Sequence, residues 1–196
     1  MAVTDLPAGV PAAFSRAAQT LRAARLRPEV RLVEVPAPQR IAPHALALSA
    51  EVDATAGADG PEVASGRFVL LHDPAGQEAW EGTTRVVTYV RAALEPEFAS
   101  DPMLSDVGWA WLTDCLAAAG ADVTALGGTV TRVLSDCHGT LRDREPTVEV
   151  EIRASWTPAE GDDVGHHLHG WADLLSTVAG LPPLPEGVTA LRRGLR

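Results

Sequence analysis

The segment 147–156 alternates between apolar and polar residues more regularly than any other part of the chain. Its apolar set is Val148, Val150, Ile152, Ala154 and Trp156, and its polar set is Thr147, Glu149, Glu151, Arg153 and Ser155. Successive side chains of a strand point to opposite faces, so this pattern predicts a strand with one face on a core. The segment 44–53 alternates in the same way. Two such strands favour an antiparallel sheet that is covered on one face only.

Apolar residues elsewhere repeat with either the strand or the helix period. Further strands are predicted over 29–35, 66–73 and 129–137, and a small loop containing glycine over 54–65. The helical period predicts helices over 11–27, from 77 or 78 to 94, 105–119 with Ser105 as N-cap, and 166–179. The expected fold is therefore α+β, in the order α-β-β-β-α-α-β-β-α, with about five antiparallel strands and helices on one face.

The length of 196 residues fits one domain, which we expect over 1–180, followed by a proline-rich and then basic tail over 181–196. The start of the chain lacks the cationic and apolar stretches of a signal peptide, and no apolar run is long enough for a transmembrane helix. Cys115 and Cys137 are expected to be reduced thiols. The missing signal peptide, the missing transmembrane run and the reduced cysteines predict a cytoplasmic protein.

All 16 basic side chains are arginines, since the sequence contains neither lysine nor asparagine. Schiff-base chemistry, the P-loop lysine and N-glycosylation are therefore excluded. The formal net charge of −10 argues against direct contact with nucleic acid and against an anionic membrane surface as the main partner. Arginines in or beside strands are Arg31, Arg40, Arg67, Arg132 and Arg153. They are expected either to form cross-strand ion pairs with glutamates or to line an anion-binding groove.

The candidate ligand-binding residues are His72, Asp73, Glu78 and Glu81, at a strand end and the start of the expected helix. The alternative is that these side chains only cap the helix and form the turn. A second polar group contains His166, His167 and His169, after Asp162 and Asp163. Because the ligand spacing of a known metal motif is missing, we expect a solvated helix start there, with no metal and no cofactor.

The helix expected over 105–119 has two adjacent apolar stripes. This apolar surface is wider than packing against one sheet requires. The candidate interface of a homodimer, or of a complex with a protein partner, therefore consists of Trp109, Leu112 and Leu116. The alternative is that this helix completes the core of the monomer. The other large indoles, Trp80, Trp111, Trp156 and Trp171, are expected to face one core.

Several stretches resemble an uncharacterised family, a domain of unknown function from high-GC Gram-positive bacteria. They are RPEVRLVEVPAPQRIAPHALALSAEV (27–52), GRFVLLHDPAGQEAWEGTTRVVTYVRAALEPE (66–97), VGWAWLTDCL (107–116), GGTVTRVLSD (127–136), and EIRASWTP with AGLPPLPEGV near the end. The resemblance covers nearly the whole chain and implies no activity. It associates the family with a ribonuclease D-type exonuclease, which implies an accessory role in RNA processing as one alternative.

The expected order of elements is also similar, in topology only, to the small acidic chaperones of type III secretion. Together these features favour a non-catalytic, acidic, protein-binding or chaperone-like module. The alternative is a small-molecule enzyme or ligand-binding protein that uses the loop from His72 to Glu81.

Overall fold

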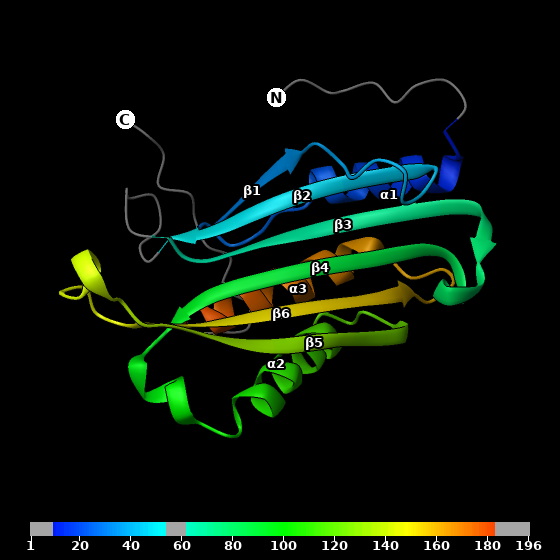
Figure 1. Ribbon diagram of the computed structural model, residues 1–196. Coiled ribbons are helices and arrows are strands. Elements are labelled where there is room, and N and C mark those ends of the chain that lie inside the picture. Colours follow the sequence, from blue (N-terminus) through cyan, green and yellow to red (C-terminus); the bar gives the residue numbers. More distant parts are fainter. Residues whose placement is uncertain (1–9, 54–61, 183–196) are drawn as a thin grey trace.

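The computed structural model describes residues 10–53 and 62–182. Its strands are β1 (Val30–Val35), β2 (His44–Asp53), β3 (Glu62–Gln77), β4 (Gly82–Leu94), β5 (Val123–Ser135) and β6 (Thr147–Pro158). Its helices are α1 (Ala12–Ala23), α2 (Leu104–Ala118) and α3 (Val164–Val178), with short 3-10 turns at Glu78–Trp80, Pro96–Ser100 and Gly139–Leu141. Figure 1 shows one sheet with the helices packed against it.

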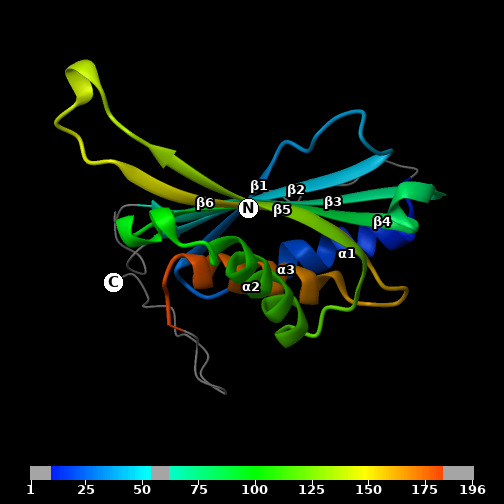
Figure 2. The same cartoon turned by 60° about the horizontal axis from the view of Figure 1, so that its bottom comes forward.

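The strands form a single sheet in the order β1-β2-β3-β4-β6-β5, and every neighbouring pair is antiparallel. Figure 2 shows that α1, α2 and α3 all lie on the same side of this sheet. The expected α+β class, with an antiparallel sheet and helices on one face, is confirmed. The sheet has six strands among the described residues, where about five were expected.

The sixth strand is β4, and the helix expected from 77 or 78 to 94 is wrong. Only a single 3-10 turn at Glu78–Trp80 precedes β4, which then runs between β3 and β6. The side chains of Val86, Val90 and Ala92 are buried at the strand period. Thr88 completes this buried row, and its hydroxyl donates to the carbonyl oxygen of Ala154 at 3.2 Å.

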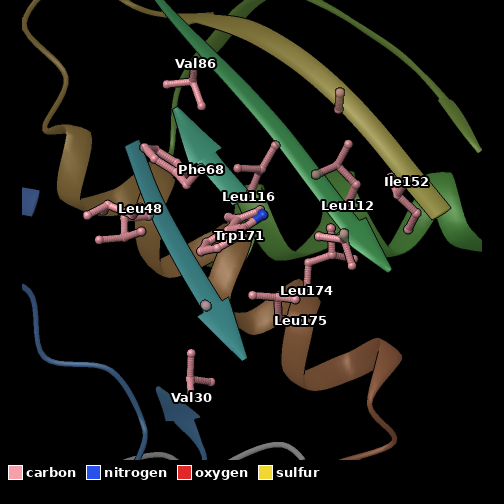
Figure 3. Close-up of a cluster of buried hydrophobic side chains, with 14 of the residues drawn as sticks. Val30, Leu48, Phe68, Val86, Leu112, Leu116, Ile152, Trp171, Leu174 and Leu175 are labelled. Atoms are coloured by element: carbon pink, nitrogen blue, oxygen red, sulfur yellow. The ribbon is translucent and has the colours of Figure 1, made fainter. Parts of the chain in front are cut away.

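The main core lies between the sheet and the three helices. Figure 3 shows the part of it in which side chains of α2 and α3 face the strands. Trp171 of α3 is fully buried at its centre, with its ring 5.7 Å from that of Phe68. Gly66 makes this position possible, because a Cβ there would lie 2.8 Å from Cζ2 of Trp171 and 2.6 Å from the carbonyl oxygen of Tyr89. Trp156 is also fully buried, so the inward placement of these two indoles is confirmed.

Trp80 is buried on the other face of the sheet, so its assignment to the main core is wrong. It packs with Ala47, Val69 and Leu71 in a second cluster, against residues of the β1–β2 connection such as Ala42. That connection rises from the face without helices, and so does the β5–β6 hairpin at the far side of the sheet (Figure 2). We call this face, between the two projections, the open face.

Some expected boundaries also shift. Helix α2 begins at Leu104, so Ser105 is not its N-cap, and the Asp101 carboxylate instead accepts from the backbone N–H of Met103 at 2.8 Å. Strand β3 takes in 62–65, which were expected in a loop, while 54–61 and the tail residues 183–196 lie outside the described part. None of the described helices is long and apolar enough to cross a membrane.

Candidate functional site

The centre of the open face is hollowed over strands β3, β4, β5 and β6. The hollow has a volume of about 420 Å³, which is within the range of small-molecule sites. It is lined by Arg67, Val69, Val87, Thr88, Tyr89, Gly127, Gly128, Thr129, Arg153, Ala154 and Ser155. Among the described residues its lining thus contains two cationic side chains and no acidic one, although the whole chain has a net charge of −10.

The register of the strands arranges these side chains in rows that run across the sheet. One row is Ser49, Arg67, Tyr89, Arg153 and Thr129. The next row is Ala47, Val69, Val87, Ser155 and Gly127. A cationic and aromatic row therefore lies directly beside a mainly apolar one, and both rows line the hollow.

A second hollow of about 530 Å³ adjoins the first one. It shares Arg67, Tyr89 and Arg153 with it and adds Ser49, Glu51, Ser65 and Gly66. The cationic row therefore separates an apolar hollow from a polar one.

The two arginines of this row differ in how they are held. The Arg153 guanidinium lies 2.6 Å from the Glu151 carboxylate and 5.2 Å from the centre of the Tyr89 ring. Arg67 is exposed and, within the described part of the chain, has no hydrogen bond, ion pair or ring contact. The Arg67 charge is therefore available to a ligand, while Arg153 is fixed in place by its neighbours.

Tyr89 links the row to Glu151, because its hydroxyl donates to that carboxylate at 2.9 Å. Burial and this hydrogen bond raise the pKa of Tyr89 above its ordinary value, so the phenol keeps its proton. The other glutamates of this face are also paired, Glu149 with Arg91 and Glu51 with Arg31. Arg67 is thus left as a cation with no acidic partner among the described residues.

Arg85 adds a further positive charge in the row of the sheet that follows the apolar row, beside Ser155. Its guanidinium donates to the hydroxyl oxygens of Ser155 and Thr157 at 2.8 and 3.2 Å, and to the carbonyl oxygen of Ala125 at 2.9 Å. All three acceptors are neutral. Because the Ser155 oxygen accepts from Arg85, its own proton is free to be donated to a group in the hollow.

The loop residues singled out in the sequence do not form one polar site. His72 is buried on the helix side of β3, with its ring 6.0 Å from Phe14 and its Nδ1 3.0 Å from the Thr84 hydroxyl. The Asp73 carboxylate accepts from the backbone of Ala75 and from the Gln77 side chain, and so closes the turn. Glu78 and Glu81 are exposed. Of the four, only Asp73 has the turn contacts of the alternative, and the helix that the others were expected to cap is absent from the described residues. A ligand-binding role of this loop stays a prediction.

Two of the three histidines of α3 lie beside one carboxylate, since His166 and His167 are 3.1 and 3.0 Å from Asp162. His166 contacts Asp162 at 3.1 Å, while His169 contacts the carbonyl oxygens of Gly165 and Arg25 at 2.7 and 3.2 Å. His167 is fully buried and accepts at Nδ1 from the Trp156 indole. In the described part of the chain, no three His, Cys, Asp or Glu side chains are grouped to hold a metal ion. The absence of a metal stays a prediction.

The helix expected to carry an interface is α2, and its residues have different environments. Leu112 and Leu116 are fully buried in the main core. Trp109 is half-buried, with Cζ3 2.9 Å from the place where a Cβ on Gly128 would lie. Val107 is exposed to 37% on the same helix. A partner surface around Trp109 stays a prediction.

From the sequence, Arg67 and Arg153 were recognisable only as members of a set expected to form ion pairs or to line an anion groove. Tyr89 was not expected at a site, because β4 was expected as a helix, and neither Ser155 nor Gly127 was expected to line a hollow. Repeated β-branched residues in the segment TTRVVTYV were the available signal for a strand there.

A comparison with family models matches residues 10–189, most of the chain, to one model described as Protein of unknown function (DUF3000). No curated protein and no solved structure matches the chain. The resemblance to an uncharacterised family, expected from the motifs, is confirmed. The match assigns a family to the chain without assigning an activity.

Proposed function

Because the chain belongs to the DUF3000 family, whose function is unknown, we propose a function from the geometry of its own residues. The protein is a non-catalytic binding protein, and the open face of its sheet is the binding face. The observation that carries this proposal is the hollow of about 420 Å³, in which Arg67 and Arg153 are the only charged lining residues among those that the structure describes. An unpaired guanidinium beside an apolar depression is a binding arrangement that needs no reactive group.

The proposal keeps the binding class expected from the sequence and places it on a different surface. A small-molecule enzyme built on the loop from His72 to Glu81 has less support, because Asp73 is used in the turn and His72 faces the main core. Neither side chain lines the hollow. A role in RNA processing has no support from the charges of the molecule, whose net value is −10.

The proposal is tested by asking whether the hollow is occupied when the protein is isolated. Gly127 lines the hollow, and a Cβ added there meets no atom within 4 Å. Gly127→Leu is therefore expected to place its side chain in the hollow. Ala117→Leu adds a similar side chain to the exposed side of α2, on the opposite side of the sheet, and is the matched control. Wild type and both variants are purified under mild conditions from the organism that produces the protein and analysed by native mass spectrometry.

We expect a bound species, whether small molecule or protein, on the wild type and on Ala117→Leu and its loss from Gly127→Leu. Circular dichroism and thermal unfolding confirm that all three proteins are folded. A bound species that stays on Gly127→Leu, or the absence of any bound species from the folded wild type, would contradict a binding role for this face.

A further inference from the structure

We propose that the ligand of the open face is a small amphipathic organic anion, with its anionic group on Arg67 and Arg153 and its apolar body in the hollow beside them. This inference rests on the proposed binding function and names the chemical class of the ligand. It follows from the arrangement of the rows on the sheet, because the row with the cationic and aromatic side chains lies directly beside the mainly apolar row.

The anionic group is inferred from the charge that the sheet leaves uncompensated. Glu51, Glu149 and Glu151 are each held by an arginine, whereas Arg67 has no partner among the described residues. A planar guanidinium binds a carboxylate or a phosphate through two parallel hydrogen bonds. Arg153 lies two strands away in the same row, with Tyr89 between them, and its guanidinium lies over the Tyr89 ring. An anionic group placed between Arg67 and this guanidinium would contact both cations.

The apolar body is inferred from the row that follows. Val69 and Val87 are cross-strand partners in that row, and the exposed fraction of the Val87 side chain is 38%. Covering such an exposed aliphatic side chain with an apolar group is favourable, because apolar surface is removed from water. The last position of the row is Gly127, where the missing side chain leaves open space. A compact aliphatic or aromatic group fits this space.

Ser155 supplies one directional polar contact inside the apolar row. Its oxygen accepts from Arg85 at 2.8 Å, so its proton points away from Arg85. Since Ser155 lines the hollow, it donates this proton to an acceptor atom on the ligand. The hollow therefore favours a ligand with an acceptor oxygen close to its apolar part.

The probe for this proposal is octanoate, used below its critical micelle concentration. Two compounds of equal chain length serve as controls for the head group: 1-octanol, which is neutral, and octylammonium, which is cationic. Inorganic phosphate tests the anionic group without an apolar body. Binding is followed by titration in two-dimensional amide NMR spectra, which locates the contact as well as measuring its affinity. The variants are Arg67→Gln, Gly127→Leu and, as a matched control, Arg132→Gln. Arg132 contacts the carbonyl oxygen of Asp101 on the helix side of the sheet.

We expect octanoate to bind about tenfold or more tightly than 1-octanol, as removal of a hydrogen bond to a charged group predicts. Octylammonium and phosphate alone should bind more weakly still. The shifted amides should be those of Val87, Gly127 and Ser155. Arg67→Gln should weaken the binding of octanoate by about tenfold and leave the binding of 1-octanol unchanged. Gly127→Leu should abolish the binding of both probes. Arg132→Gln should change the affinity for neither.

Equal affinity for octanoate and octylammonium, shifts on the helices instead of the open face, or an unchanged octanoate affinity in Arg67→Gln would overturn the inference. These failures are distinguishable from failure of the proposed function. If the isolated protein carries a bound species that Gly127→Leu loses, while octanoate does not bind, the binding face stands and the anionic ligand class is wrong.

Discussion

The indole N–H of Trp156 donates to Nδ1 of His167 across 3.0 Å, between two fully buried side chains. An acceptor nitrogen carries no proton, so the proton of the neutral imidazole is on Nε2. Nε2 lies 3.0 Å from the Asp162 carboxylate but is not aligned for a hydrogen bond. This pair ties β6 to α3 and makes the core depend on His167 staying neutral.

The first prediction is that the free energy of unfolding falls as the pH is lowered from 7 to 5. Burial lowers the pKa of His167 below its ordinary value, against the opposing effect of Asp162. In the unfolded chain the same imidazole takes up a proton below about pH 6.5, so the unfolded state binds more protons and is favoured by acid. Urea unfolding at a series of pH values measures this slope.

His167→Gln should be less stable than wild type at pH 7 and should lose part of the slope, since glutamine does not titrate. The remaining slope belongs in part to His72, whose pKa is also lowered, first by burial and then by the charge of His44. His166→Gln is the matched control, because that side chain is exposed and the Trp156–His167 pair remains. A wild type equally stable at pH 7 and pH 5 would contradict the role of His167.

The second prediction concerns the two fully buried indoles. Trp156→Ala and Trp171→Ala should each lower the free energy of unfolding by about 3–5 kcal/mol, because each leaves a large cavity in the main core. Trp111→Ala should cost less, since that side chain is only partly buried. Denaturant midpoints measure all three, and equal losses at Trp111 and Trp171 would contradict the placement of Trp171 at the centre.

The third prediction separates two glycines of the same sheet. Gly66→Val should destabilise the protein by about 1–3 kcal/mol or more, because its Cβ would lie within 3 Å of Trp171 and of the Tyr89 backbone. Gly127→Val should be tolerated, since its Cβ meets no atom within 4 Å. Thermal unfolding of both variants measures the difference, and equal melting temperatures would show that Trp171 does not pack on Gly66.

Much of the fold was predictable where one face of a strand is apolar and the other polar. Strand β2 was predicted with its observed bounds and β6 within two residues, because the buried positions of β2, and those of β6 up to Trp156, carry only apolar side chains. The part of β6 beyond Trp156 begins with Thr157, a buried polar residue. Strand β4 was not, since Thr88 stands at a buried position and Val87 and Tyr89 stand on the open face. With a polar residue at a buried position and apolar residues on the open face, the alternation typical of a strand is not visible in the sequence of β4. The remaining apolar residues fit a helical spacing.

The candidate site depends on that missing strand. Arg67 and Arg153 are 86 positions apart in the chain and share a row only because β4 lies between β3 and β6. With 77–94 expected as a helix, the strand register that places Tyr89 between them was not available. The two arginines were recognisable from the sequence as residues of the outer face. That they line the same hollow follows from the strand order, which the sequence did not reveal.

The last prediction keeps the partner surface expected on α2. A homodimer or a partner complex that uses the surface around Trp109 requires exposed apolar residues there, and Val107 and Met103 are exposed on or beside this helix. We expect the wild type to sediment as a dimer at micromolar concentration and Val107→Glu to sediment as a folded monomer.

Val107 suits this test better than Trp109, because the Trp109 ring packs at Gly128 and its replacement also disturbs the fold. Ala117→Glu, exposed on the same helix, is the charge-matched control and should stay dimeric. A monomeric wild type without a co-purifying partner, together with unfolding of Trp109→Glu, would show that Trp109 serves only the core of the monomer.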